Sequence, residues 1–420
     1  MWALALAGLS TVSTSPAQAA PCVSNTSTFT GDGTNGLVNA VYTVHTFTTV
    51  TSCDWTVPSS VPQVDVLIVG GGGGGGSWVG AGGGAGAMIE TSSVSVTPSS
   101  VIAITVGAGG LGAITSDRAG LTSRFGENGS ASSFGAVTAA GGGRGGQWNA
   151  TAGSGGSGGG GAGSTGVTAG SASNAFYGFA GGAPNVNYDY GYPTGGGGGA
   201  GAVGAAGTVT ASVSGKSGNG GVGKISRING SATYYAGGGG GGCHGNGGYV
   251  CNVGSGGLGG GGSGDGWFAG DTIVNGADGV ANTGGGGGGS GGPHVSTGTS
   301  SQGGSGGSGV VIVRYISDVT STPSLGSGRI NQSTVAFRTS TQLQINLPIT
   351  GKVTFLQFGK QIPGCRNITL TPGATATCQW KPMTRGFIPV TAIVYQSGVS
   401  ALYKRIEYKF FSISRSGVRA

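Results

Sequence analysis

The sequence predicts an all-β protein in which a long glycine-rich domain is followed by a smaller β domain. Glycine supplies 101 of the 420 residues, whereas charged residues make up only 7 %. Val, Ile, Thr, Tyr and Phe are scattered along the chain, and no long helical periodicity accompanies them. Glycine then becomes scarce, with only 7 in residues 329–420. This composition indicates β-structure together with a glycine-specific structure.

Two apolar segments flank the glycine-rich tract. Residues 64–69 (VDVLIV) run directly into Gly70, and residues 310–315 (VVIVRY) follow Gly309. Nearly continuous apolar character is typical of strands that are buried on both faces. We therefore expect these two segments to pair with each other and to close the tract between them.

Further strands are predicted close to the first of these segments. Residues 41–47 and 55–57 have the composition of strands. Residues 93–96 and 101–106 also have strand composition and are separated by the sequence TPSS. Because Pro and Ser are typical turn residues, this arrangement predicts a hairpin in which the two segments pair with each other.

The glycine tract itself is unsuited to a helix. Residues 70–86 contain 12 glycines in 17 positions. At about 1 kcal/mol per glycine, a helix there would be destabilised by roughly 12 kcal/mol. Two structures remain. One is a flexible linker; the other is a bundle of polyproline-II-type (polyglycine-II) segments with three residues per turn, whose backbones approach closely because glycine lacks a side chain.

Large side chains within the tract favour the ordered bundle, because flexible linkers rarely contain them. These residues are Trp78, Trp148, Phe176, Tyr177, Phe179, Tyr188, Tyr190, Tyr192, Tyr234, Tyr235, Trp267 and Phe268. Ordering so much glycine carries a large entropic penalty. We therefore expect the flanking strands to form a core that nucleates the bundle.

The N-terminus has the features of a secretory signal. An apolar run at residues 2–12 precedes Ala17-Gln18-Ala19, which fits the small-x-small cleavage pattern and assigns residues 1–20 to a signal peptide. The absence of Lys and Arg before the apolar run departs from the usual pattern. No later segment approaches the roughly 18–20 apolar residues that a membrane span needs. We expect a secreted or extracellular protein without a transmembrane segment.

Six cysteines in an exported chain predict three disulfides. Six cysteines allow about 15 pairings, and the choice that keeps each pair within one segment is Cys22–Cys53, Cys243–Cys251 and Cys365–Cys378. The last pair closes a loop of about 13 residues, which contributes about 3 kcal/mol on the chain-entropy model.

Charge is distributed unevenly along the chain. Residues 329–420 contain 12 Lys+Arg and 1 Asp+Glu, or +11, and the remainder contains 7 and 11, or −4, which together give the net charge of +7. A basic domain attracts anionic surfaces such as cell-wall polymers or lipid headgroups. The alternative is a basic surface that only confers solubility, since charge is the sole evidence for an anionic partner.

Residues 317–328 have the composition of a Pro/Ser/Gly linker, and residues 329–420 form the predicted second domain. Alternating segments at 334–338, 342–347 and 351–355 lie about ten residues apart, which predicts a small β-sandwich. The sequences GKVTFLQFGKQIPGC and ATCQWKPMTRGFIPVTAIVY resemble the bacterial immunoglobulin-like repeats of secreted actinobacterial proteins. This resemblance implies an immunoglobulin-like β-sandwich that serves as a spacer or display module, or at most binds sugars or the cell wall.

The first domain also resembles a known family. The sequences YTVHTFTTVTSCDWTVPSSVPQVDVLIVGGGGGGG, VTPSSVIAITVGAGGLG, SRFGENGSASSF and GGSGVVIVRY are similar to the glycine-rich domain of bacterial surface proteins and phage tail proteins. The resemblance spans about residues 27–315, within a glycine-rich domain that we expect at residues 21–316. It implies a β-sandwich core whose loops expand into packed polyglycine helices. It implies adhesion or surface display rather than chemistry.

Two motifs suggest a function that their context does not support. Residues 66–72 (VLIVGGG) followed by Glu90 mimic a dinucleotide-binding turn, but that fingerprint needs a helix where the glycine run lies. Residues 347–351 (LPITG) match the sortase pattern. Sortase substrates continue with an apolar span and a basic tail, whereas here a domain follows, so the motif is interpreted as the end of a strand and a turn.

Neither a metal site nor a catalytic site is predicted. Cys243-His244 with Cys251 lacks the third or fourth ligand that zinc needs, and Asp265, Asp271 and Asp278 are interpreted as turn residues rather than Ca²⁺ ligands. Acid–base catalysis needs paired carboxylates or a His–carboxylate unit, and the 12 acidic residues are widely scattered. We expect a protein that is not an enzyme and binds no cofactor.

The candidate ligand contacts are aromatic: Tyr188, Tyr190 and Tyr192 in one loop, and Trp267. Exposed aromatic side chains bind sugars or proteins by stacking and apolar burial, but packing onto the glycine bundle explains them equally well. The predicted function is that of an adhesive display protein that binds a glycan, a surface receptor or an anionic cell-wall polymer, with no nucleic-acid partner. The alternative is an ice- or mineral-binding protein, although the irregular glycine runs argue against a flat, repetitive face.

Overall fold

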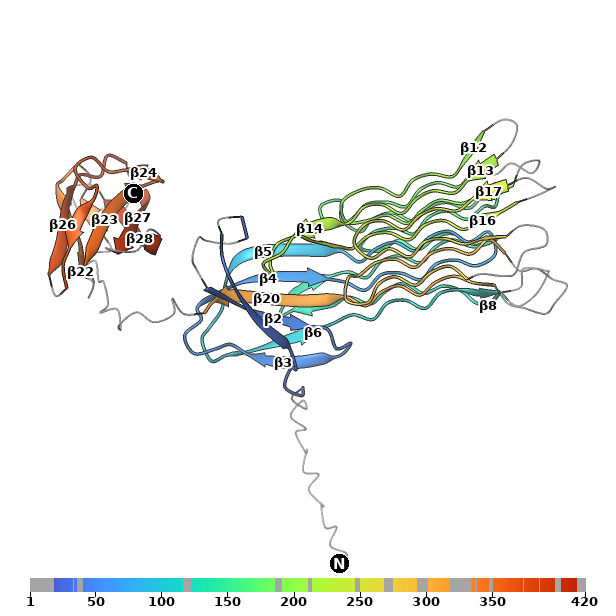
Figure 1. Cartoon of the computed structure of the whole chain (residues 1–420), viewed down its shortest axis with the longest axis horizontal. Coiled ribbons are helices and arrows are strands. Elements are labelled where there is room, and N and C mark those ends of the chain that lie inside the picture. The colour runs from blue at the N-terminus through green and yellow to red at the C-terminus, as the bar shows by residue number, and fades with distance from the viewer. Residues whose placement is uncertain are drawn as a thin grey trace, which may run out of the picture. The chain divides into compact units, whose positions relative to one another are not determined.

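The computed structural model of the chain is shown in Figure 1. It describes residues 19–32, 34–35, 41–115, 122–185, 191–210, 214–245, 250–267, 275–292, 301–317, 334–336, 338–346, 350–372, 374–384, 386–396 and 402–413. Every regular element in these residues is a strand, which confirms the all-β prediction. The chain forms two compact units, Met1–Ser27 with Thr43–Tyr315, and Thr28–Tyr42 with Ile316–Ala420.

Two sheets form a β-sandwich at the start of the glycine-rich domain. The first has the strand order β1-β2-β20-β4-β5, and the second has the order β10-β9-β6-β3. The strands are β1 (Asn25–Thr30), β2 (Val41–Phe47), β3 (Ser52–Thr56), β4 (Gln63–Val69), β5 (Met88–Ser95), β6 (Val101–Thr105), β9 (Ser132–Phe134), β10 (Val137–Ala139) and β20 (Val310–Ile316). Side chains from both sheets, including Phe47, Trp55, Ile104 and Val311, share one buried core.

The segments that flank the glycine tract pair as predicted. Strands β4 and β20 are antiparallel, with Val69 opposite Val310. At the other end of the pair, the Arg314 Nε donates to the Asp65 Oδ2 at 2.9 Å. The chain therefore leaves the sandwich at the end of β4 and returns to it, more than 200 residues later, beside its point of departure.

The predicted hairpin between residues 93–96 and 101–106 is wrong. Strand β5 pairs with β4 in one sheet, whereas β6 pairs with β3 and β9 in the other. The connection is held instead by Val57, the residue after β3. The Ser99 N–H donates to the Val57 carbonyl at 3.0 Å, and the Val57 N–H donates to the Ser100 carbonyl at 2.9 Å. These bonds direct the chain into the second sheet, where it completes the core from the opposite side.

Beyond the sandwich, the glycine tract continues as extended segments that run side by side (Figure 1). Residues 71–76 donate hydrogen bonds of 2.8–2.9 Å to three neighbouring segments in turn, so that every third residue bonds to the same neighbour. These neighbours are residues 127–130, 304–307 and 81–84. A period of three residues is that of the polyproline-II helix. In its described residues, the tract is therefore the predicted ordered bundle and not a flexible linker.

The same segment touches three further neighbours through the positions where side chains would stand. A Cβ placed on Gly71, Gly72 or Gly73 would lie 2.0–2.2 Å from a carbonyl oxygen of Ala108, Gly285 or Gly143 respectively. Residues 71–76 thus have six neighbouring segments. Three of them accept hydrogen bonds from the N–H groups of this segment, and the three in direct backbone contact donate hydrogen bonds to its carbonyl groups, as the Gly142 N–H does to the Gly71 carbonyl. Such contact explains why glycine is required along the interior segments.

Short strands extend parts of the bundle. They are β7 (Ile114–Thr115), β8 (Thr122–Arg124), β11 (Tyr192–Pro193), β12 (Thr208–Thr210), β13 (Ser214–Lys216), β14 (Lys224–Ser226), β15 (Thr233–Tyr235), β16 (Cys243–His244), β17 (Val250–Asn252), β18 (Gly266–Trp267) and β19 (Ser301–Gln302). Strands β8, β12, β13, β16 and β17 lie at the end of the bundle that is remote from the sandwich (Figure 1). We call this end the distal end.

The C-terminal unit has a core between a large sheet and a two-stranded one. The large sheet has the order β21-β28-β27-β23-β24, with β25 also paired to β23, and the small one consists of β22 and β26. The strands are β21 (Thr334–Ala336), β22 (Thr341–Asn346), β23 (Gly351–Gln357), β24 (Lys360–Gln361), β25 (Ile368–Leu370), β26 (Thr375–Trp380), β27 (Gly386–Gln396) and β28 (Leu402–Ile413). Leu343, Phe355 and Trp380 pack in one buried cluster.

The immunoglobulin-like assignment stays a prediction. Of the sortase-like motif, residues 347–349 lie outside the described residues, and Gly351 begins β23.

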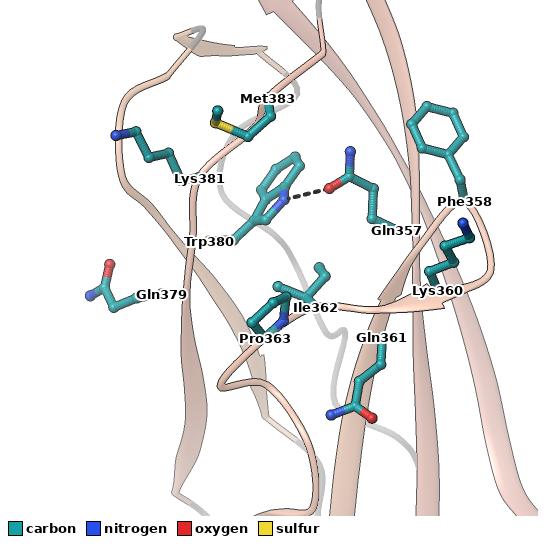
Figure 2. Close-up of a pocket in the computed structure, with 10 residues that line it drawn as sticks. All are labelled: Gln357, Phe358, Lys360, Gln361, Ile362, Pro363, Gln379, Trp380, Lys381 and Met383. Carbon is teal, nitrogen blue, oxygen red and sulfur yellow. Dashed lines mark hydrogen bonds between the residues drawn. The ribbon is translucent and has the colours of Figure 1, made fainter.

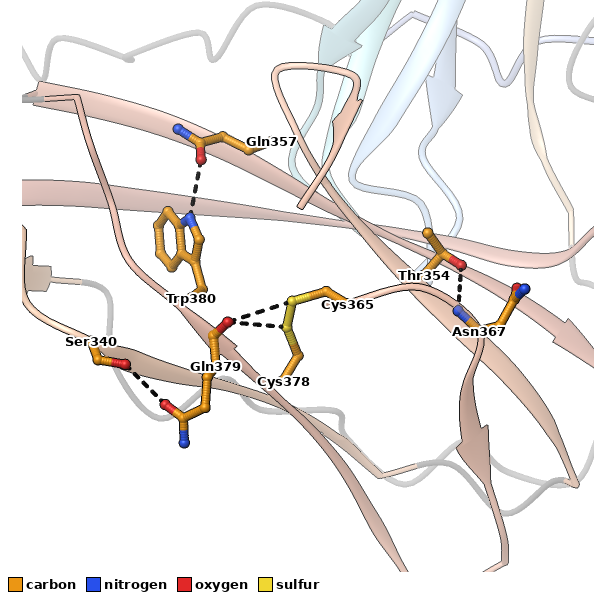
Figure 3. Close-up of a disulfide and its surroundings, with 8 residues drawn as sticks. All are labelled: Ser340, Thr354, Gln357, Cys365, Asn367, Cys378, Gln379 and Trp380. Atoms are coloured by element: carbon orange, nitrogen blue, oxygen red, sulfur yellow. Dashed lines mark hydrogen bonds between the residues drawn. A yellow bond between two sulfur atoms is a disulfide. The ribbon is translucent and has the colours of Figure 1, made fainter. Parts of the chain in front are cut away.

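All three predicted disulfides are present. The Cα–Cα distances are 4.9 Å for Cys22–Cys53, 5.8 Å for Cys243–Cys251 and 5.4 Å for Cys365–Cys378, within the usual range. Figure 3 shows the last of them beside Trp380, where it joins the loop after β24 to β26. Disulfides of this number are typical of an oxidising compartment. Among the residues that the structure describes, no helix has the length and apolarity to cross a membrane.

Candidate functional site

The distal end of the bundle is built from turns that carry the large side chains. The first hairpin of the tract closes with a hydrogen bond of 2.9 Å from the Gly76 N–H to the Ala81 carbonyl. Within this turn, Trp78 and Val79 adopt positive φ angles of 46° and 48°. This conformation is uncommon for bulky residues, and it places a tryptophan at the distal end.

Four aromatic side chains from separate turns form one cluster there. The ring centroids of Trp78 and Trp148 lie 5.1 Å apart, those of Trp148 and Tyr192 6.2 Å, and those of Tyr192 and His244 5.7 Å. These spacings are typical of favourable aromatic pairs. All four residues are half-buried, so each packs against its neighbours and remains partly accessible to solvent. We call these four residues the distal aromatic cluster.

The backbone around the distal aromatic cluster is shaped to accommodate it. Strand β16 lies between β11 and β18, with His244 opposite Tyr192 on one side and opposite Trp267 on the other. A Cβ placed on Gly292 would lie 2.8 Å from the Trp78 Cδ1 and 3.0 Å from the His244 Nδ1. The cluster therefore relies on a glycine at position 292, and the Cys243–Cys251 disulfide ties β16 to β17 next to it.

Two of the four aromatic residues predicted as ligand contacts lie at or beside the distal aromatic cluster. Tyr192 belongs to the distal aromatic cluster, and the backbone of Trp267 lies beside it in β18. Tyr188 and Tyr190 lie outside the described residues. Sequence reasoning did not select Trp78, Trp148 or His244 as site residues. Their signal was available, since Trp78 and Trp148 each interrupt a glycine run at the point where an extended segment has to turn.

His244 is neutral in the folded protein at physiological pH. Burial lowers the pKa of its imidazole to about 4, and a hydrogen bond with the backbone of Gly291 opposes part of this shift. A neutral ring is suited to packing against the Tyr192 ring. It is unsuited to ion pairing with an anionic ligand.

This lowered pKa predicts acid sensitivity of the glycine-rich domain. The unfolded chain takes up a proton near pH 6.5 and the folded chain only near pH 4, so the unfolded state is favoured progressively as the pH falls between these values. The loss from His244 amounts to about 3 kcal/mol at most. Calorimetric unfolding at pH 7 and pH 4.5 tests this. A His244→Gln variant should lose less stability on acidification than the unsubstituted protein, and an identical pH dependence of both would contradict the prediction.

One of the loosely clustered aspartates has a structural use. The Asp278 Oδ1 accepts a hydrogen bond of 2.7 Å from the Ser305 N–H, which fixes two adjacent segments of the bundle. Asp271 lies outside the described residues. Within the described part of the chain, no group of three or more His, Cys, Asp or Glu side chains is arranged to hold a metal ion.

The architecture is that of a glycine-rich domain: a β-sandwich from which a bundle of polyglycine segments projects. The chain belongs to the glycine-rich domain family, whose model matches residues 47–316, well over half of the 420 residues. No curated protein matches the chain.

Proposed function

We propose that this protein is a secreted or cell-surface adhesive display protein, in which the glycine bundle is a rigid support and the distal aromatic cluster binds a glycan or a surface receptor. The observation that carries the proposal is the contiguous set of half-buried rings at the distal end. Partly exposed aromatic rings on a rigid scaffold stack on sugar rings and on apolar groups of proteins at a low cost in conformational entropy. The immunoglobulin-like module acts as a stalk.

The support for a rigid role is the hydrogen bonding of the bundle. Because interior segments such as residues 71–76 are hydrogen-bonded to six neighbouring segments, the distal turns are held at a fixed distance from the sandwich. An adhesive protein benefits from such a support, since a preorganised surface loses little entropy on binding. The proposed export agrees with three disulfides and with the signal-like N-terminus.

Binding to a glycan array or to whole cells tests the role of the distal aromatic cluster. Replacing Trp148 and Tyr192 together by Ala should weaken binding at least about tenfold, the loss typical of a central aromatic contact. The matched control is Phe176→Ala. Phe176 is 82 % exposed, and its neighbour Tyr177 bonds to Met88 at the sandwich end of the bundle. Binding that survives the double substitution, or that is lost equally in the control, contradicts the proposal. Thermal hysteresis in the purified protein would favour the ice-binding alternative.

The basic C-terminal unit is proposed to attach the protein to an anionic polymer. Residues 329–420 carry 12 Lys+Arg and 1 Asp+Glu, and attraction of this origin weakens as salt screens it. Retention of the full chain on an anionic polymer should therefore be strong at low salt and weak at high salt. Retention that is absent at low salt would remove this part of the proposal.

A further inference from the structure

The C-terminal unit has a surface groove of about 610 Å³, within the range of small-ligand sites. Figure 2 shows that it lies between the turn that joins β23 to β24 and the segment that follows β26. The groove is thus formed by two stretches of chain, residues 357–363 and 379–383. Neither the sequence motifs nor the net charge pointed to this location.

The floor of the groove is apolar and already fixed. Ile362 and Trp380 are buried, the latter with only 2 % of its surface exposed. The Trp380 Nε1 donates a hydrogen bond of 3.0 Å to the Gln357 Oε1 (Figure 2). The Gln357 Nε2 in turn donates to the Thr384 Oγ1 at 3.3 Å. These two bonds hold the indole and the amide in place, so this part of the floor is fixed before a ligand binds.

The rim carries two exposed apolar side chains. Phe358 is 55 % exposed and Met383 is 58 % exposed. Phe358 and Gly359 form the two-residue turn between the paired Gln357 and Lys360, with φ angles of 49° and 74°. Asn and Gly are the residues that such a turn favours. An aromatic ring that is both exposed and held in an unfavourable backbone conformation indicates a functional requirement for the ring.

The charge at the groove has one sign. Lys360 and Lys381 stand on opposite sides of it (Figure 2), and its lining contains no acidic residue. No ion pair joins either lysine to a described side chain. Gln361 and Gln379 add amide groups at the same surface, and amides both donate and accept hydrogen bonds. The groove therefore combines an apolar ring, two ammonium groups that pair with no described carboxylate, and neutral polar groups.

We propose that this groove binds a segment of an acidic polysaccharide. A uronic-acid type of sugar unit presents a C–H face to Phe358, a carboxylate to Lys360 or Lys381, and hydroxyl groups to the amides. An acidic peptide in extended conformation fits less well, because β24, the sheet edge beside the groove, is only two residues long and offers little backbone to pair with. The inference rests on the proposed attachment through the C-terminal unit and assigns that attachment to one site.

Binding of the full chain to immobilised alginate, a polyuronate, tests the inference, with dextran as the neutral polymer and poly-glutamate as the acidic peptide. The variant Lys360→Gln with Lys381→Gln should bind alginate about tenfold more weakly. The matched control is Lys352→Gln with Arg366→Gln, which removes the same charge from two exposed residues outside the groove and should change binding by less than about threefold, since only general attraction is reduced. Phe358→Asn should weaken binding about fivefold while the thermal stability is kept or raised, because Asn suits this turn.

The outcomes separate the two proposals. If the unsubstituted chain is not retained on alginate at low salt, the attachment fails and the groove assignment fails with it. If it is retained and both double variants lose the same affinity, the attachment stands and the groove assignment is overturned. If poly-glutamate binds more tightly than alginate through Lys360 and Lys381, the ligand is an acidic peptide and the polysaccharide assignment is overturned.

Discussion

Replacing Gly72 by Ala is expected to destabilise the glycine-rich domain by about 3 kcal/mol or more. The added Cβ would lie 2.0 Å from the carbonyl oxygen of Gly285, a separation far below van der Waals contact. Overpacking of a core usually costs about 1–3 kcal/mol because side chains rotate aside. Here the obstacle is a backbone segment that is itself hydrogen-bonded to further segments. The clash can therefore be relieved only if the segments of the bundle move apart. Calorimetric unfolding measures the effect.

Gly126→Ala is the matched control for this substitution. A Cβ at Gly126 would have its nearest neighbour, the Gly75 carbonyl oxygen, at 3.1 Å, a much milder contact than the 2.0 Å at Gly72. Both changes reduce the entropy of the unfolded chain by the same amount, so the difference between them reports the clash in the folded bundle. The control should retain most of its stability. Equal melting temperatures of the two variants would contradict close backbone packing.

Loss of the Cys365–Cys378 disulfide is expected to destabilise the C-terminal unit by about 3 kcal/mol. The pair closes a loop of 13 residues, and both cysteines belong to the core cluster with Trp380. Replacing both by Ala removes the crosslink and leaves the apolar surroundings. For a domain of this size, a loss of this magnitude lowers the melting temperature by roughly 10–25 °C, which a calorimetric transition of the C-terminal unit would reveal.

The reciprocal variant supplies the control for the disulfide. Replacing Cys243 and Cys251 by Ala removes a crosslink from the glycine-rich domain. It should lower that domain's transition and leave the C-terminal one unchanged, because the two units are separately compact. An unchanged C-terminal transition in the Cys365→Ala, Cys378→Ala protein would show that the disulfide is dispensable there.

Much of the fold was predictable because its determinants are local. The continuous apolar runs at β4 and β20 predicted buried, paired strands, and the spacing of the cysteines predicted the three disulfides. The hairpin predicted between β5 and β6 failed because turn composition gives the position of a turn and not the sheet to which the next strand belongs. That choice depends on Val57, which follows β3 and is hydrogen-bonded to the turn.

The candidate sites were only partly predictable because they depend on contacts between distant turns. Tyr192 was predicted from a local concentration of tyrosines, but its partners Trp148 and His244 lie in other turns that only the bundle brings together. The groove of the C-terminal unit gave no sequence signal, since its residues are far apart in the sequence. Phe358 follows β23, whereas Lys381 follows β26. Repetitive glycine segments also carry little information on which segment lies beside which.

Amide hydrogen exchange of the purified protein tests the central claim, that residues 70–309 contain an ordered bundle of hydrogen-bonded backbone segments. The N–H groups of the interior segments, such as those of residues 71–76, are bonded to neighbouring segments. Their exchange should be slowed by at least roughly a thousandfold relative to an unstructured chain, as in the cores of stable domains. Exchange of these amides at the rate of an unstructured chain would contradict the bundle and, with it, the rigid presentation of the distal aromatic cluster.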